Sequence, residues 1–180
     1  MANREALREL QSRLAQRLRA VRDESPAQSW LAVECGGQGL LVALPGAGEI
    51  FPFAGVMPVP HTRPWFVGVA NLRGGLHGVI DLAAFLGLRP TMSAPEAVRE
   101  NAHLLSLSAG LGSHSALLVE KLAGLRSAAQ LQPEADDGAP RPSFAGRRWR
   151  DVDGRVWQEL DLPALAQHEQ FLAIGDSMAG

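Results

Sequence analysis

The stretch VANLRGGLHGVIDL, residues 69–82, holds three glycines in five positions and only two charged residues, Arg73 and Asp81. A dinucleotide-binding loop requires the spacing G-x-G-x-x-G, and a phosphate-binding loop requires a lysine after its last glycine; neither pattern is present. Strand-forming residues continue after the glycines, where a phosphate-binding loop would lead into a helix. The segment therefore predicts a β-hairpin with strands near Phe66–Arg73 and Leu76–Leu82 and with Gly74-Gly75 as its turn residues.

The sequence on both sides of this hairpin is similarly rich in strand-forming residues from Pro26 onward. Short apolar segments alternate with glycine and proline, which predicts many short strands arranged in barrels or a sandwich. AAFLGL, residues 83–88, predicts a helical turn closed by Gly87, and residues 103–125 predict a pair of strands around a glycine turn. Residues 132–142 predict an exposed loop, and a last hairpin is expected to turn at Asp153-Gly154. LPALAQHEQFLAI predicts a C-terminal helix capped by Asp161.

Residues 2–24 predict an amphipathic helix that ends before Pro26. Its apolar stripe consists of Leu7, Leu10, Leu14, Leu18 and Val21. An isolated helix of this length is marginal in water, so it must dock on the body of the protein or on a neighbour. Its six arginines raise a third alternative, an anionic membrane surface, but the apolar stripe has no aromatic residue.

Composition excludes several classes of function. The net charge is -2, which argues against a general nucleic-acid binder. No run approaches the roughly 18 apolar residues that span a bilayer, and charged residues interrupt the N-terminus where a signal peptide would have its apolar core. We therefore expect a cytoplasmic protein without membrane insertion. Cys35 is the only cysteine, so no internal disulfide forms, and we expect it to be a small buried residue.

Signals for catalysis or metal binding are weak. The five histidines show no i,i+4 pairing and no H-E-x-x-H, and no G-x-S-x-G nucleophile motif is present. The four tryptophans are expected in the core and at its rim. The run of Arg147, Arg148 and Arg150 has acidic neighbours, which argues against single-stranded nucleic acid as its partner. We expect no catalytic residue, metal or cofactor, although a small-molecule-binding β-barrel enzyme stays open as an alternative of a different class.

Residues 59–87, VPHTRPWFVGVANLRGGLHGVIDLAAFLG, resemble the CheW family of bacterial chemosensory adaptors. Asn71-Leu72-Arg73-Gly74 and Asp81-Leu82 match the family pattern residue for residue, and Glu49-Ile50 lies where the family carries a Glu-Ile pair. The resemblance covers residues 28–175. PHTRPW, the arginine-rich N-terminal segment and RPSFAGRRW are most similar to the PilI-like branch, which is tied to type IV pili and twitching motility.

The resemblance implies a mainly β, CheW-like fold of two SH3-like five-stranded β-barrel subdomains with flanking N- and C-terminal helices. We expect a helix at residues 1–25, the CheW-like domain at 26–175 and a tail at 176–180. The implied function is a non-catalytic adaptor that couples the cytoplasmic tip of a methyl-accepting chemoreceptor to a CheA-like histidine kinase and that contacts other CheW-like proteins. The implied output is pilus control, with flagellar chemotaxis as the alternative, and the implied location is cytoplasmic, at membrane-bound receptor arrays.

The resemblance further implies that the protein-interaction residues are Glu49, Ile50, Asn71, Leu72, Arg73, Gly74 and Asp81. Strand alternation places Arg73 on one face with two valines, and a half-buried unpaired arginine would cost several kcal/mol. Asp81 lies about five residues along the partner strand, roughly 17 Å away, which is too far for contact. Glu49 belongs to the preceding strand, and the resemblance implies that it lies together with the Asn-Leu-Arg-Gly segment, so Glu49 is the predicted partner of Arg73.

Overall fold

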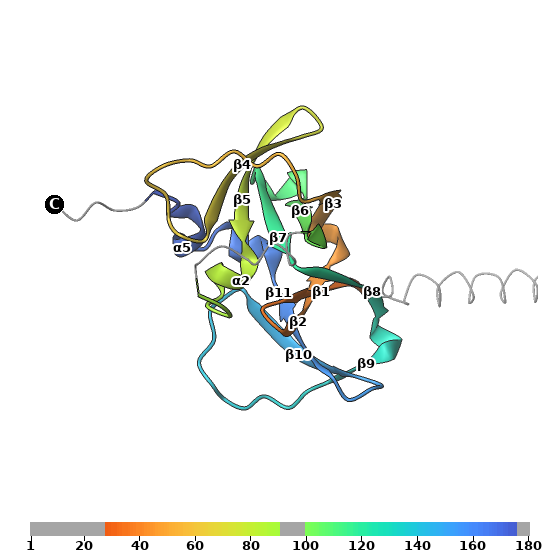
Figure 1. The fold of residues 1–180 in the computed structure, drawn as a ribbon. Helices are drawn as coiled ribbons and strands as arrows, with labels where there is room; N and C mark the ends of the chain where they lie inside the picture. Colours follow the sequence, from red (N-terminus) through yellow and green to blue (C-terminus); the bar gives the residue numbers. More distant parts are fainter. Residues whose placement is uncertain (1–27, 91–99, 176–180) are drawn as a thin grey trace, which may run out of the picture.

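Two curled β-sheets make up most of the described chain (Figure 1), in a computed structural model that describes residues 28–90 and 100–175. The first sheet has the order β8-β1-β2-β11-β10-β9, and the second has the order β3-β6-β7-β5-β4. The elements of the first sheet are β1 (Ser29–Cys35), β2 (Gln38–Ala43), β8 (Lys121–Ser127), β9 (Leu131–Pro133), β10 (Ala145–Asp151) and β11 (Val156–Leu160). The elements of the second sheet are β3 (Ala47–Pro52), β4 (Phe66–Leu72), β5 (Gly75–Asp81), β6 (His103–Leu107) and β7 (Ser115–Val119).

The predicted hairpin is present as β4 and β5, but its turn lies one residue earlier than expected. Leu72 pairs with Gly75, so the two turn residues are Arg73 and Gly74. Both have positive φ, 49° and 82°, which is the conformation of a type I′ turn. The prediction that Gly74-Gly75 forms the turn is therefore wrong, and Arg73 stands at a turn position rather than at a strand end.

The second sheet closes on itself through the segment that follows β3. Met57 forms an isolated bridge with Val69 of β4, with both backbone hydrogen bonds at 2.8 Å. This contact joins the segment that follows β3, at one end of the sheet order, to β4 at the other end. β5 and β7 are parallel, as are β2 and β11 in the first sheet, and the other strand pairs in both sheets are antiparallel. The mainly β prediction with two barrel-like units is confirmed, and the short strand β9 brings the first sheet to six strands where five were expected.

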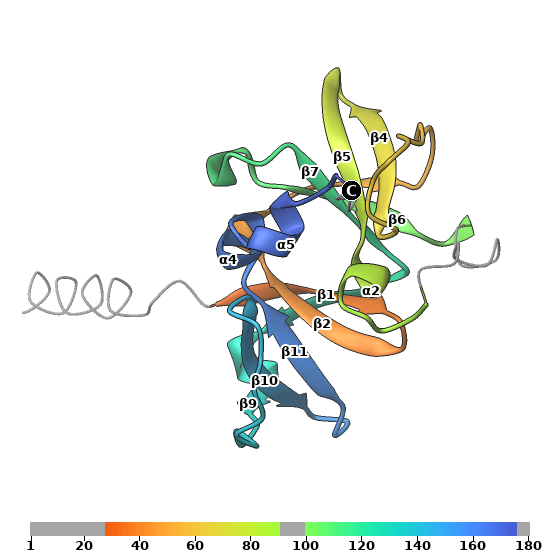
Figure 2. The ribbon, with the colours of Figure 1, turned by 90° about the vertical axis from the view of Figure 1, so that its left-hand side faces the viewer.

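Apolar side chains form three clusters, one inside each curled sheet and one between them. The cluster inside the first sheet includes Trp30, Trp149 and Trp157, and the cluster inside the second includes Leu72, Val79, Leu104 and Leu118. The largest cluster lies between the sheets and draws on both of them, through residues such as Val33, Leu40, Ile80, Leu117, Leu162 and Phe171. Figure 2 shows the helices beside this junction. The core is thus shared, and it fixes the two units to each other.

The short helices largely follow the sequence prediction. α2 (Leu82–Phe85) begins after Asp81 and is followed by Gly87 at φ 69°. The C-terminal helix is split into α4 (Leu162–Ala166) and α5 (Glu169–Leu172), and Asp161 caps α4 through the amide of Ala164 at 2.9 Å. Three 3-10 turns complete the described elements: η1 (Leu44–Gly46), η2 (Ala109–Leu111) and η3 (Ala128–Gln130).

The predicted strand pair at residues 103–125 is divided between the two sheets. The expected strand pair in residues 103–125 contains β6 and β7, but β8 begins within it and belongs to the other sheet. The chain thus passes from the second sheet to the first within a predicted strand. The helix expected at residues 2–24 and the tail at 176–180 lie outside the described residues.

Candidate protein-interaction site

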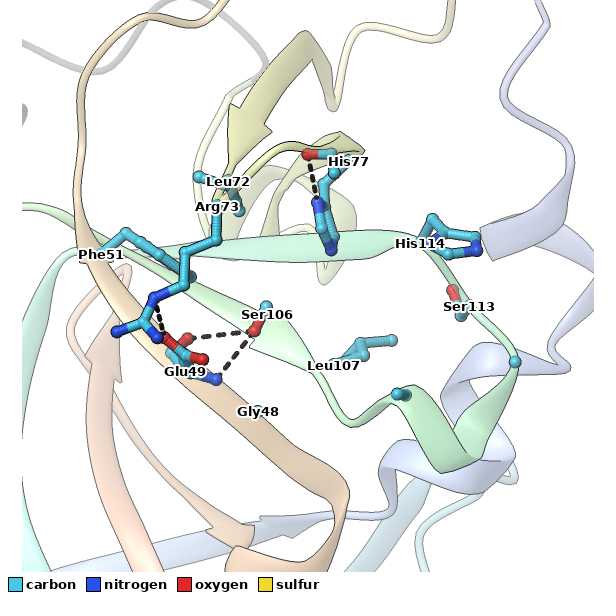
Figure 3. A pocket seen from close by; sticks show the side chains of 13 residues that line it. Gly48, Glu49, Phe51, Leu72, Arg73, His77, Ser106, Leu107, Ser113 and His114 are labelled. Carbon is cyan, nitrogen blue, oxygen red and sulfur yellow. Dashed lines mark hydrogen bonds and ion pairs between the residues drawn. The ribbon is translucent and has the colours of Figure 1, made fainter.

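The predicted pair between Arg73 and Glu49 is present at the rim of the second sheet. Arg73 Nε lies 2.8 Å from Glu49 Oε2. The side chains are 76% and 52% exposed, so the premise of a half-buried arginine is wrong and desolvation does not force this pairing. The pair forms because the curl of the sheet brings the tip of the β4–β5 hairpin over β3. Figure 3 shows the Arg73 side chain reaching down to Glu49.

Glu49 lies at an irregularity of β3 that a serine side chain stabilises. The register between β3 and β6 shifts between Ala47 and Ile50, which leaves the backbone of Glu49 without regular strand partners. Ser106 Oγ accepts from Glu49 N at 2.8 Å and donates to Glu49 O at 3.2 Å. A Cβ on Gly48 would lie 2.5 Å from the same Oγ, so this position requires glycine. Gly48 and Ser106 therefore fix the backbone from which Glu49 extends.

Each residue of the Asn71-Leu72-Arg73-Gly74 motif has a separate structural task. Asn71 Oδ1 accepts the backbone N–H of Gly74 at 2.8 Å, which holds the turn closed. Leu72 is buried inside the second sheet and anchors the hairpin there. Gly74 takes φ 82° without strain, whereas Arg73 adopts φ 49°, a conformation that costs an L-residue about 1–2 kcal/mol. The motif thus presents one strained, exposed cation at the end of a rigid turn.

The pair borders a cleft of about 380 Å³ at the mouth of the second sheet (Figure 3). Ser106 and Phe51 line it beside the pair, and His77 and His114 line its other side. The two imidazole rings are 5.9 Å apart between centroids, and His77 Nδ1 lies 3.0 Å from the carbonyl oxygen of Gly75. The sequence analysis did not select either histidine. Strand alternation places His77 on the same face as the buried Val79, which is a signal that would have found it.

The domain that carries this rim matches the family model of the CheW-like domain over residues 29–170. The chain belongs to the CheW family. The match includes both sheets, α2 and α4, so it covers all the elements that position Glu49 and Arg73.

Relatives of this CheW-family chain include a PilI protein and two chemotaxis proteins. Protein PilI of Pseudomonas aeruginosa is 28% identical over 168 residues, which cover 90% of this chain and 88% of the relative. Chemotaxis protein CheW of Rhizobium meliloti is 24% identical over 142 residues, or 78% and 88% of the two chains. The probable chemotaxis protein CheW of Rhizobium etli is 37% identical over 60 residues, 33% of this chain and 39% of the relative.

A solved structure supports the same fold. The scaffolding protein TtCheW of Thermoanaerobacter tengcongensis matches with a TM-score of 0.60 and 14% identity, over 74% of this chain and 84% of that one. Proteins of the CheW family have a coupling and scaffold role in chemosensory signalling, and this chain shares that general role.

Asp81 of the CheW-family motif lies away from the exposed rim and is buried. One carboxylate oxygen accepts the amide of Ala84 at 3.1 Å and so caps α2, and the other forms an ion pair with Arg89. Arg89 also binds Glu120 at 2.7 Å, and Glu120 accepts the amide of Gly36 at 3.0 Å. Glu120 lies between β7 and β8, and Gly36 lies in the β1–β2 turn, so the network joins the two sheets.

Of the remaining predicted residues, Ile50 lies beside the pair and is 43% exposed. Leu76, opposite Asn71 in the hairpin, is 64% exposed, although the sequence analysis did not select it. Apolar side chains that stay exposed next to a charged pair are typical of a docking surface.

Two carboxylates of the first sheet have perturbed pKa values. The indole N–H of Trp157 binds Asp151 at 2.8 Å and lowers the pKa of that carboxyl below its usual 3.8. The guanidinium of Arg155, 2.7 Å from Glu34, lowers the pKa of Glu34 in the same way. Trp157 belongs to β11, next to the β10 strand of Asp151, whereas Arg155 lies just before β11 and reaches Glu34 of β1. Both carboxylates therefore have partners within the first sheet and offer no free general base.

Cys35 and the charged groups offer no obvious reactive centre within residues 28–90 and 100–175. Burial raises the pKa of the Cys35 thiol to about 12, which keeps it protonated and unreactive. Among the described residues, no group of three or more His, Cys, Asp or Glu is arranged to hold a metal ion. None of the helices in the described part of the chain is long and apolar enough to cross a membrane.

Proposed function

We propose that this chain couples the cytoplasmic tip of a methyl-accepting chemoreceptor to a CheA-like histidine kinase, in a pathway that controls type IV pili and twitching motility. In this proposal the protein acts in the cytoplasm at receptor arrays and has no catalytic step of its own. The docking surface is the rim formed by Glu49, Ile50 and the turn Asn71–Gly74. In this proposal, other CheW-like proteins also contact this rim.

The assignment of this rim as a docking surface rests on the conformation of Arg73. Arg73 is exposed and adopts φ 49° at a position where asparagine or glycine would be less strained. Backbone strain of this kind clusters at functional sites, so the strained conformation of Arg73 supports a role in docking a partner. The turn fixes the direction of the arginine, and Glu49 fixes its rotamer. A partner therefore meets a preorganised charge pair and loses little side-chain entropy on binding.

The charged pair and its apolar neighbours have complementary tasks. An exposed ion pair contributes little to folding, about 0–1 kcal/mol, but it orients a partner and sets specificity. The exposed side chains of Ile50 and Leu76 supply apolar area that a partner covers. Asp81 contributes indirectly, because its buried network with Arg89 holds the two sheets in place.

The pilus pathway is supported by the PilI relative, whose match extends over 90% of this chain. A flagellar chemotaxis coupler is the second candidate, and it is supported by the two Rhizobium relatives named as CheW. Deletion of the gene distinguishes them. Lost twitching with normal swimming supports the pilus pathway, whereas poor swimming with normal twitching supports the flagellar one.

A pull-down with alanine variants tests the docking surface. We expect Arg73→Ala and Glu49→Ala each to reduce recovery of the kinase or the receptor, and the double variant to be little worse than either, because coupled residues are not additive. Arg150 and Glu134 supply a matched control, since they form an exposed ion pair on the first sheet with distances of 2.8 Å and 2.9 Å. Alanine at both control positions should leave recovery unchanged. Fully additive losses at Arg73 and Glu49 would mean that the two residues act separately.

A further inference from the structure

The cleft beside the Glu49–Arg73 pair contains two imidazoles that the docking rim itself does not use. His77 projects from β5, and His114 lies directly before β7. Their ring centroids are 5.9 Å apart, and Figure 3 shows the ring of His77 hanging from the hairpin into the cleft. Apolar side chains supply much of the remaining lining: Phe51, Leu72 and Leu107.

A single contact decides which ring nitrogen of His77 faces a ligand. His77 Nδ1 lies 3.0 Å from the carbonyl oxygen of Gly75. A carbonyl oxygen only accepts, so Nδ1 carries the hydrogen and Nε2 of the neutral ring has a bare lone pair. Within residues 28–90 and 100–175, no hydrogen bond engages Nε2. His77 can therefore donate into the cleft only after its ring takes up a second proton.

The same imidazoles set the charge of the cleft. Its titratable lining consists of Glu49 on β3, Arg73 in the turn, His77 and His114, while β6 and η2 contribute no titratable side chain to the described lining. Glu49 and Arg73 balance each other through their contact at 2.8 Å. The cleft is therefore close to neutral while both imidazoles are neutral, and it becomes positive as pH falls through the range in which histidines titrate.

Building on the proposed docking function, we propose that this cleft receives the carboxylate of an Asp or Glu side chain of the partner when His77 is doubly protonated. Nε2–H of His77 donates to the carboxylate, His114 adds a second positive charge, and the apolar lining covers the methylene stem of the acidic side chain. The contact is present below the pH at which His77 loses its second proton and is lost as pH rises through that value.

A titration with acetate tests the carboxylate site without a partner. The imidazole resonances of the full-length chain are followed against pH in about 0.2 M sodium acetate and in sodium chloride of equal ionic strength, so that screening is matched. With a dissociation constant of about 0.1 M for the doubly protonated ring, acetate should raise the titration midpoint of His77 by about 0.5 pH unit. His61 is the internal control, because it is exposed and lies outside the cleft lining. An unchanged midpoint at His77, or an equal rise at His61, would overturn the proposal.

Binding of the kinase or receptor tests the use of the site in docking. The parent should bind about tenfold more tightly near pH 6 than near pH 8, as expected when partner binding shifts the titration of His77 by about one pH unit. His77→Phe keeps an aromatic ring but cannot donate, so it should equal the parent near pH 8, which also shows that it is folded, and lack the increase near pH 6. His61→Asn is the matched control and should keep the increase, since asparagine tolerates the φ of 57° at that position.

An equal increase in the parent and in His77→Phe would refute the role of His77 in docking. If neither the kinase nor the receptor binds at either pH, the coupling function fails instead, and the acetate titration still decides whether the cleft binds a carboxylate.

Discussion

Replacing Arg73 by asparagine is expected to stabilise the fold while it weakens partner binding. Arg73 occupies the first central position of a type I′ turn with φ 49°, followed by Gly74 at φ 82°. Asn-Gly is the favoured pair for this turn, because asparagine tolerates the left-handed conformation. The hydrogen bond from Gly74 N to Asn71 stays available in the variant, since it involves the side chain of Asn71.

Two opposing terms set the size of the effect. Relief of backbone strain contributes about 1–2 kcal/mol. Loss of the ion pair with Glu49 costs about 0–1 kcal/mol, because the two side chains are 76% and 52% exposed. The net expectation is a gain of about 1 kcal/mol in the free energy of unfolding, between limits of about 0 and 2 kcal/mol. For a chain of this size, a gain of about 1 kcal/mol corresponds to a rise of roughly 2–4 °C in Tm.

Urea unfolding followed by tryptophan fluorescence measures this gain, because Trp30, Trp149 and Trp157 are all buried. Two single variants separate the terms: Arg73→Lys keeps the strain and the charge, and Glu49→Gln removes the ion pair but keeps the turn. Arg73→Asn in the Glu49→Gln background isolates the backbone effect, and there it should give the full gain. A variant that loses 1 kcal/mol or more in that background would refute the assignment of strain to Arg73. Unchanged kinase or receptor binding by Arg73→Asn would refute its role in docking.

Three further predictions concern the Met57–Val69 bridge, the Arg89 ion pairs and the hydrogen bond between Asp151 and Trp157. Gly68→Ala places a Cβ 2.1 Å from Met57 O, so we expect faster hydrogen exchange at the amides of the Met57–Val69 bridge and weaker partner binding. Arg89→Met leaves the buried carboxylate of Asp81 and the partly buried one of Glu120 without their cation, and it should lower the free energy of unfolding by about 3–5 kcal/mol in urea titrations. Asp151→Asn should destabilise the chain at neutral pH. The difference between variant and parent should begin to shrink as pH falls below about 3.8 and vanish only below the lowered pKa of folded Asp151, because the stability that this carboxylate contributes is lost as pH falls through that pKa.

The sequence predicted local structure better than it predicted contacts between distant segments. Alternation and turn residues were sufficient for the β4–β5 hairpin, for α2 and for the Asp161 cap. The turn was misplaced by one residue because a glycine pair is the stronger turn signal in the sequence. The side chain of Asn71 selects the actual turn by accepting Gly74 N, and this contact becomes visible only once the backbone is built.

The partner of Arg73 was predicted correctly, but for the wrong physical reason. Burial of the guanidinium was expected to require a carboxylate partner, whereas Arg73 is largely exposed. The contact instead depends on the closure of the second sheet, which no local pattern encodes. The partner of Asp81 was missed for a related reason. Arg89 follows α2 and turns back beneath it, so the ion pair depends on the helix geometry between them.

The site therefore depends on tertiary structure although its motif is local in sequence. Glu49 belongs to β3 and Arg73 to the β4–β5 turn, and β3 and β4 stand at opposite ends of the strand order. The two charges meet only while the sheet is closed by the bridge between Met57 and Val69. A partner that requires both charges in register consequently binds the closed barrel and not a loosened one, and its binding energy stabilises that closure. Substitutions far from the rim, at Gly68 for example, can therefore abolish docking without removing any residue that a partner contacts.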